Sequence, residues 1–224
     1  MACLAALVNG VSASAAEPPR DIDASMRQRC PAYVAWIEHQ QAATRPLEPA
    51  PIERAPSDPA LRDTLMRMAS DDQEARTRAI SGVESDAVRR LFETDALNLE
   101  QIRLIVALTG VPSITTIGRD GMSAFWLLVQ HADADPVFQA DMLDAFEDPA
   151  HRGDIGRDVI AMLADRVRLA AGKPQLYGTQ VSIEGGKQML RPTADPLRLN
   201  ARRAAVGLPP MKDYRCALRV MYGK

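Results

Sequence analysis

The histidine at position 131 lies in the sequence environment that most favours chemistry. It follows an apolar run, and helical spacings of three, four and seven residues place it on the same side as Leu128, Leu127 and Ala124. That side is expected to face the core, so the imidazole should point inward. A buried imidazole oriented by a carboxylate is suited to act as a general base. The alternative is a core histidine that only joins two helices through hydrogen bonds.

Arg166 makes a parallel case on a later helix. Val159, Met162 and Leu163 precede it by seven, four and three residues, so its guanidinium is in line with an apolar stripe. An unpaired arginine inside a protein is very costly, so a carboxylate or a bound anion must accompany it. The two interpretations are a buried ion pair and a clamp for a substrate carboxylate or phosphate. The acids available nearby are Asp133, Asp135 and Asp165.

A short polar loop follows the helix that carries Arg166. Gln175, Tyr177, Thr179 and Gln180 bring hydrogen-bonding groups without charge into six positions, and Gly178 allows close approach of the backbone. Such a loop could line a pocket. Taken alone, the pattern is more typical of a connection between the helix and the hairpin whose polar side chains only satisfy backbone groups.

These residues define one expected site, with two functions left open. In the first, the chain is a hydrolase or group transferase acting on a small polar or peptide-like substrate, with His131 as general base and Asp133 or Asp165 orienting it. In the second, it is a non-catalytic ligand-binding or protein-interaction domain in which the same groups form a structural network. The expected substrate-binding residues are Gln130, Arg166, Gln175, Tyr177, Thr179 and Gln180.

Composition argues against several other classes of protein. The 27 Lys and Arg residues are balanced by 29 Asp and Glu residues, and aromatic residues make up 4% of the chain, so nothing favours nucleic-acid binding. The Arg89-Arg90 and Arg202-Arg203 pairs are interpreted as solvated helix faces. The established metal, nucleotide and nucleophile motifs are missing from the sequence, and we expect neither a metal nor a cofactor. His39 and His151 are expected at the surface.

The first sixteen residues are typical of a secretory signal peptide. They carry no charge, are rich in Ala, Leu and Val, and end in Ala13-Ser14-Ala15-Ala16 before Glu17. A positively charged leading segment is missing, and a buried or frayed N-terminal helix is the alternative. The pattern predicts a periplasmic or secreted protein, and no later apolar run has the length to cross a bilayer, so no membrane contact is expected after signal removal.

Two cysteines remain once the expected signal is removed. Cys30 and Cys216 lie near opposite ends of the mature chain. In an oxidising compartment they could form a disulfide worth about 4 to 5 kcal/mol in the chain-entropy model. Two buried free thiols are an equally supported interpretation, because the sequence gives no distance between them.

Periodicity predicts a mainly α fold: a helical domain with a small β-hairpin near residues 180–190, where Gly185-Gly186 separates two short apolar runs. Helix starts are predicted at Ser57-Asp58-Pro59, Ser70, Asn98, Asp135-Pro136, near Asp154 and at Asp195-Pro196, and helix ends at Gly110 and Gly172. A short tail is expected after Pro209-Pro210. The predicted parts are a signal peptide (1–16), an N-terminal helical element interrupted by Pro31 (17–43), a proline-rich linker (44–59) and the main domain (60–224).

Several separated motifs, in order, resemble a bacterial domain family of unknown function, the one numbered 6624. The resemblance spans about Asn98 to Tyr214 and implies that His131, Arg166 and the Tyr177–Gln180 loop belong to one shared site. It implies no activity. The motifs are Gly110-Val111-Pro112, Gly118-Arg119-Asp120-Gly121, Trp126 through Asp133, Asp165-Arg166-Val167, Gln175 through Gln180, Arg191-Pro192, and Arg202-Arg203-Ala204 with Gly207-Leu208-Pro209.

Overall fold

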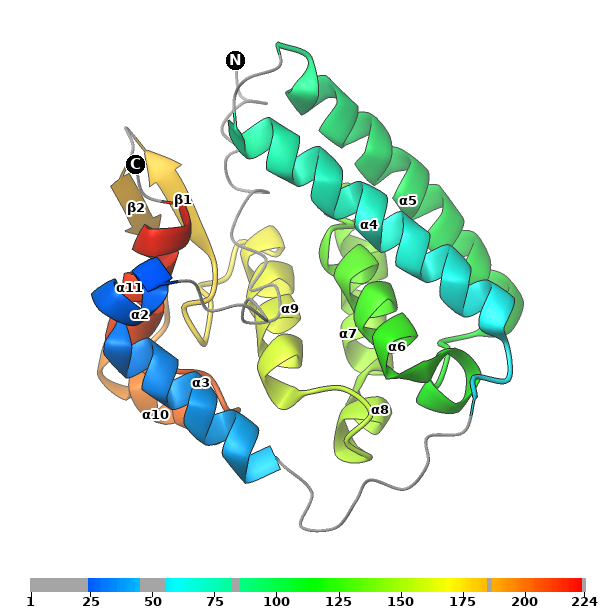
Figure 1. Cartoon of the computed structure of the whole chain (residues 1–224). Helices are drawn as coiled ribbons and strands as arrows, with labels where there is room; N and C mark the ends of the chain where they lie inside the picture. Colours follow the sequence, from blue (N-terminus) through cyan, green and yellow to red (C-terminus); the bar gives the residue numbers. More distant parts are fainter. Residues whose placement is uncertain (1–23, 45–54, 82–84, 185–186, 223–224) are drawn as a thin grey trace.

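The computed structural model describes residues 24–44, 55–81, 85–184 and 187–222 of the chain. These residues form a mainly helical protein with one two-stranded antiparallel hairpin, which confirms the predicted fold class (Figure 1). The expected signal peptide, most of the proline-rich linker and the Gly185-Gly186 turn lie outside the described residues.

The larger group of helices contains the main hydrophobic core. Three long helices pack together at one side of the molecule, and three shorter ones follow them (Figure 1). Leu65, Ile102, Phe125 and Leu163, from four different helices, are completely buried in this core. The helices are α4 (Pro59–Ser81), α5 (Ala87–Thr109), α6 (Ile114–Gln130), α7 (Pro136–Ala145), α8 (Glu147–His151) and α9 (Arg157–Ala170).

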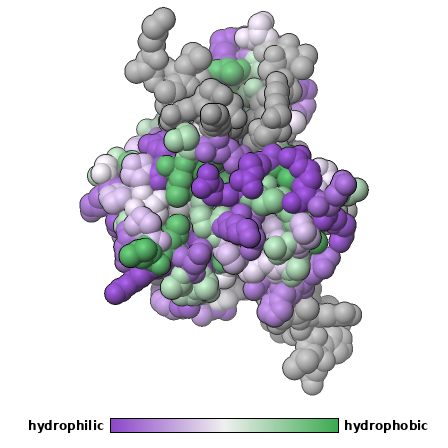
Figure 2. Space-filling model, turned by 90° about the vertical axis from the view of Figure 1, so that its left-hand side faces the viewer, coloured by the Kyte–Doolittle hydropathy of each residue, from purple (hydrophilic) through white to green (hydrophobic). Residues whose placement is uncertain are grey.

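A second group lies on the other side of α9 (Figure 1). The strands of its hairpin are in register from Val181 opposite Leu190 to Glu184 opposite Lys187. The face of the molecule on this side is mostly hydrophilic, with hydrophobic residues only in small patches (Figure 2). The elements of this group are α2 (Ala24–Arg29), α3 (Pro31–Thr44), β1 (Val181–Glu184), β2 (Lys187–Leu190), the 3-10 turn Pro196–Arg198, α10 (Leu199–Ala205) and α11 (Met211–Tyr222).

Some predicted helix ends are confirmed and others are wrong. Asp135 caps α7 by accepting from the backbone N–H of Phe138, and Gly110 ends α5 with a positive φ of 72°. The predicted starts at Ser70 and Asn98 are wrong, because each residue lies inside one continuous helix. A capping-box spacing inside a helix is overridden when the apolar stripe continues across it.

The short tail predicted after Pro210 is also wrong. Residues Met211–Tyr222 form α11, whose Tyr214 and Leu218 are buried one turn apart. The spacing of these two residues is helical, so the signal was present in the sequence. The two prolines directly precede α11, whereas α10 already ends at Ala205.

A disulfide joins the N-terminal helices to α11. Cys30 and Cys216 are bonded, with 5.8 Å between their Cα atoms. Around them, Met26, Ile37 and Ala217 form a small core of their own. The pairing favoured by one of the two sequence interpretations is therefore the one found. Within the described ranges, no helix combines the length and the apolar character that crossing a membrane requires.

Candidate functional site

His131 lies at the C-terminal end of α6 and faces inward, as its spacing predicts. It is the residue directly after the helix, its backbone N–H donates to the carbonyl of Leu127, and it is 4% exposed. Its Nδ1 lies 2.8 Å from Oδ2 of Asp72 and 2.9 Å from Nε of Arg76, both on α4. Because α4 and α6 start side by side and run in the same direction, and α4 is the longer helix, the end of α6 lies beside the interior of α4 (Figure 1).

These contacts fix which imidazole nitrogen carries the proton. A carboxylate only accepts, whereas the Nε–H of Arg76 has a second acceptor in Oδ2 of Asp72 at 3.2 Å. We therefore assign the proton of His131 to Nδ1, which donates to Asp72. The lone pair of Nε2 then has no partner among the described residues. Burial, with the charge of Arg76, outweighs Asp72 and lowers the pKa of His131 to about 4, so the ring is neutral near pH 7.

Asp72 is fully ionised in this arrangement. Burial acts to raise the pKa of Asp72, but His131 and Arg76 together lower it to about 2. A second carboxylate, Asp95 on α5, lies 2.6 Å from Nη2 of Arg76. Burial, with the negative charge of Asp72, raises the pKa of Asp95 to about 7 despite the opposing charge of Arg76. One guanidinium is thus shared by two carboxylates of different proton affinity.

Arg166 on α9 also faces inward and is 7% exposed. Its Nη1 lies 2.6 Å from both carboxylate oxygens of Asp133, whose side chain is nearly half exposed. Burial alone would raise the pKa of Asp133, but the charge and hydrogen bond of Arg166 hold it below its ordinary value. Gln139 on α7 supports the same turn by donating to Asp133 and to the carbonyls of Val129 and Gln130.

Four buried side chains next to this network keep polar atoms without a hydrogen-bond partner among the described residues. They are Nε2 of His131, Nε and Nη2 of Arg166, Nδ2 of Asn98, and both amide atoms of Gln130. All four residues are less than a tenth exposed, and Gln130 is 0% exposed. Leaving such an atom unpaired in the interior costs about 1 to 3 kcal/mol. The network therefore combines paired ionic groups with buried polar atoms that have no partner among the described residues.

Asp165 has a different role from His131, although the sequence placed it in the same site. It is 0% exposed, and its carboxylate accepts from the backbone N–H groups of Leu176, Tyr177 and Thr179 and from the hydroxyl of Thr179. These four hydrogen bonds hold the loop that follows α9. The carboxylate that orients His131 is Asp72, while Asp133 pairs with Arg166.

The expected loop residues are mostly engaged with one another. Gln175 donates to the carbonyls of Gln180 and Arg191, and its Oε1 accepts from the N–H of Gln180. The amide of Gln180 donates to Oγ1 of Thr179. Tyr177 lines a separate hollow of about 350 Å³ between α8 and α9. Within the described residues, no hydrogen bond joins this loop to His131 or Arg166.

The expectation that Arg202 and Arg203 form a solvated face is wrong. Arg203 is completely buried, donates to the carbonyls of Tyr177 and Pro209, and lies 4.7 Å from the ring centre of Tyr214. Burial lowers the pKa of Arg203 to about 10. Arg202 donates to the carbonyl of Leu176, so both arginines hold the loop. Arg89 and Arg90 are exposed, as predicted.

Sequence reasoning missed Asp72, Arg76, Asp95 and Asn98. The signal for two of them was the one that found His131: Asp72 is seven residues after Leu65, and Arg76 follows four later, so both continue the buried stripe of α4. Asn98 is likewise four residues before the buried Ile102, but a capping interpretation assigned it to a helix start.

The fold and the site together define a helical protein whose buried ionic network brings together residues of α4, α5, α9 and the C-terminal end of α6. The chain belongs to the family of unknown function DUF6624, whose model matches residues 59–224. The match begins with α4 and confirms the resemblance seen in the sequence, and it leaves α2, α3 and Cys30 outside. No curated protein and no solved structure matches the chain.

Proposed function

We propose that this chain binds a small polar molecule against Gln130, His131, Asn98 and Arg166. The observation that carries the proposal is that these buried groups keep polar atoms without a hydrogen-bond partner among the described residues. A purely structural network would be expected to pair its atoms, because each unpaired one lowers stability. A binding site accepts this loss in the free protein and recovers it when the ligand binds.

The free atoms indicate the chemistry of the ligand. Gln130, Asn98 and Arg166 offer N–H donors, whereas Nε2 of His131 and Oε1 of Gln130 are acceptors. The positive charge of Arg166 is already balanced by Asp133. A matching ligand carries a carbonyl or carboxylate oxygen together with an O–H or N–H group, as hydroxy acids and short peptides do.

General-base catalysis is the second candidate, and the contact between Asp72 and His131 favours it. A carboxylate on Nδ1 leaves Nε2 free to take a proton from a hydroxyl or from water, as a hydrolase or group transferase requires. The lowered pKa of His131 makes Nε2 a weak base until a bound anion raises that pKa. For this reason we propose ligand binding as the primary function and general-base catalysis as the alternative.

Calorimetric titration with lactate, glycylglycine and propionate tests the proposal. Lactate and glycylglycine carry both kinds of group, whereas propionate lacks the O–H or N–H donor. We expect binding of the first two and weaker binding of propionate, with Gln130→Leu abolishing the difference. The proposal is contradicted if none of the three compounds binds. It is also contradicted if the Gln130→Leu variant binds them with the same affinities as the native protein.

His131→Gln and Asp72→Asn separate the two candidates. If His131 only binds, His131→Gln retains an acceptor and keeps most of the affinity, and Asp72→Asn has a small effect. If His131 is a base, hydrolysis of the bound dipeptide is lost in both variants while binding persists. Arg103→Gln, which removes an exposed ion pair with Asp135, is the control for a change of charge nearby.

We also propose that the protein is exported to the periplasm or secreted. The uncharged start of the sequence supports this, and the bond between Cys30 and Cys216 is of the kind that persists in oxidising compartments. Mass spectrometry of the protein from fractionated cells tests it. We expect a mature N-terminus at Ala16 or Glu17 and an oxidised cysteine pair. A cytoplasmic protein that retains residues 1–16 contradicts the proposal.

A further inference from the structure

A cleft of about 710 Å³ lies between α4, α6 and the start of α9. This volume is in the range of pockets that bind small molecules. Gln73 belongs to the wall of the cleft and also donates to Asp72, at 2.8 Å. The cleft therefore adjoins the buried network but is lined by different side chains, and neither the family nor the proposed function accounts for it.

The wall of the cleft is mainly apolar. Met66 and Ala69 from α4 face Met122 and Trp126 from α6, and Val159 closes the side formed by α9. Trp126 is 5% exposed, so its indole ring is fixed in the wall. Such a surface favours the hydrocarbon part of a ligand, and an indole ring also attracts cations.

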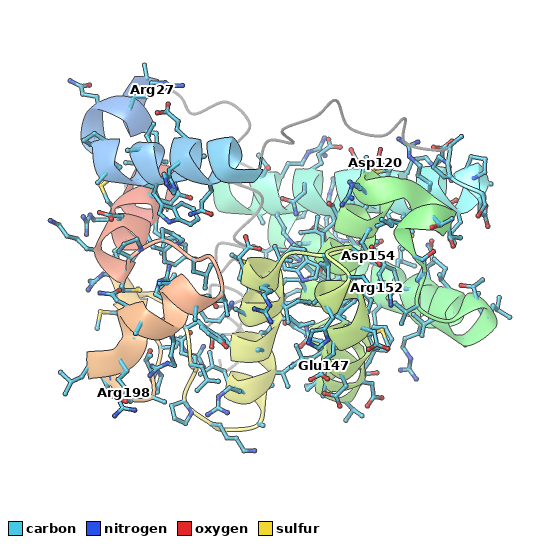
Figure 3. All side chains as sticks on the ribbon, turned by 90° about the horizontal axis from the view of Figure 1, so that it is seen from below. Arg27, Asp120, Glu147, Arg152, Asp154 and Arg198 are labelled. Carbon is cyan, nitrogen blue, oxygen red and sulfur yellow. A yellow bond between two sulfur atoms is a disulfide. The ribbon has the colours of Figure 1, made fainter. Side chains whose placement is uncertain are left out.

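Three carboxylates line the same cleft. Asp120 on α6 and Asp154 in the loop before α9, both labelled in Figure 3, each have an arginine partner, Arg62 and Arg152 respectively. Asp158 forms no ion pair among the described residues. Its carboxylate accepts only from backbone N–H groups at the start of α9, and burial raises its pKa.

Among the described residues, Asp158 is therefore the cleft carboxylate without an ion pair, although the cationic Arg119 also lines the cleft. The ionised form of a half-buried carboxylate near an apolar wall is stabilised when a positive charge approaches it. From this arrangement we infer that the cleft binds a small organic ammonium ion, with its hydrocarbon part against Trp126 and its charge against Asp158. The backbone N–H groups at the start of α9 favour anions instead, so an anionic probe is the informative competitor.

Three probes with the same hydrocarbon chain test the inference: n-hexylamine, 1-hexanol and hexanoate. The chain has two tryptophans, Trp36 and Trp126, so the Trp36→Phe variant leaves Trp126 as the only indole reporter. We expect hexylamine to change the fluorescence of Trp126 and to bind about tenfold more tightly than hexanol, a difference of about 1.4 kcal/mol. Hexanoate should bind most weakly.

Asp158→Asn should bring the affinity for hexylamine to that for hexanol. Asn can still accept from the start of α9, so the fold should persist. Asp141→Asn, which removes an exposed carboxylate of α7 outside the cleft, should leave the preference for hexylamine unchanged. Ser70→Phe, at an exposed position of α4 in the cleft wall, should fill the cleft and remove the response to all three probes.

Three results would overturn the inference. The first is no response of Trp126 to any probe, and the second is equal binding of the three probes. The third is hexylamine binding that Asp158→Asn or Ser70→Phe leaves intact. Because Gln130 does not line the cleft, Gln130→Leu should not affect hexylamine binding, and the test of the cleft is therefore independent of the proposed function.

Discussion

Two glutamines show, residue by residue, how the site differs from an ordinary core. Gln130 and Gln139 are both buried in the same region. Gln139 makes three hydrogen bonds from its Nε2, whereas neither amide atom of Gln130 has a partner among the described residues. The physical cost of burying an amide is the same for both residues, but only Gln139 recovers it within the described residues.

Replacing each glutamine with leucine should therefore have opposite effects. Gln130→Leu keeps the volume and removes two unpaired polar atoms, so we expect about 1 to 2 kcal/mol of added stability. Gln139→Leu leaves the carbonyls of Val129 and Gln130 without their donor, and it should cost about 1 to 3 kcal/mol. Urea unfolding of both variants measures this. A loss of stability in Gln130→Leu would show that its amide is paired in the folded protein.

His131 and Asp95 are both largely buried, and their pKa values are shifted in opposite directions. The two residues should therefore make the stability of the fold depend on pH in opposite ways. The pKa of His131 falls from 6.5 to about 4, so its protonation favours the unfolded chain, and its contribution to stability is lost as pH falls from 6.5 to 4. The pKa of Asp95 rises from 3.8 to about 7, so its contribution is lost as pH rises over that window. In the native protein the two contributions oppose each other.

Single substitutions should separate them. In Asp95→Asn, His131 remains, and stability should rise with pH between 4 and 6.5 by up to about 3 kcal/mol. In His131→Gln, Asp95 remains, and stability should fall with increasing pH over the same window. Urea midpoints measured at several pH values test both slopes. Parallel slopes in the two variants contradict this account of the network.

The conformation of the loop after α9 depends strongly on one carboxylate. Asp165 accepts four hydrogen bonds from Leu176, Tyr177 and Thr179, and Arg203 holds the loop from the other side. An asparagine offers one acceptor oxygen in place of two and adds N–H groups that face other donors. Asp165→Asn should therefore cost about 2 to 4 kcal/mol.

Hydrogen exchange locates the effect of Asp165→Asn. The backbone N–H groups of Leu176, Tyr177 and Thr179 should lose protection more than those of α4 and α6, because the substitution releases the loop before it unfolds the core. Asp141→Asn, at an exposed position, is the matched control. Unchanged protection of the three loop amides would mean that other contacts, such as those of Arg203, hold the loop.

The helices and the loop also show which features of the site could be predicted from the sequence. Apolar spacing predicted the inward direction of His131 and Arg166, and the same periodicity predicted the mainly helical fold, because burial of a helix face follows directly from periodicity. Asp72 could not be paired with His131 from sequence, since their contact joins residues 59 positions apart through the packing of α4 against α6. Arg203 was misjudged because its partners are backbone carbonyls, which have no sequence signal.

At the scale of the whole molecule, the two groups of helices differ in how they are held. The group from α4 to α9 has a large core, whereas α2 and α3 pack against each other and α11 around a small one. The disulfide connects α11 to the segment outside the family match. A small core supplies little stability by itself, so the N-terminal helices should depend on the covalent link.

Removal of the disulfide should therefore release α2 and α3 first. The bond closes a loop with a sequence separation of 186 residues, for which the chain-entropy model gives about 5 kcal/mol. We expect Cys30→Ala/Cys216→Ala, made together with Cys3→Ser, to lower the urea midpoint and to expose the amides of α2, α3 and α11 to exchange. The amides of α6 near His131 should keep their protection at low urea, because the larger core does not include the N-terminal helices.

Cys3→Ser alone, oxidised and then reduced, is the control, and reduction should reproduce the double variant. Simultaneous loss of protection in α6 and α11 would show instead that the molecule unfolds as one unit, and that the N-terminal helices support the polar site as well as their own small core.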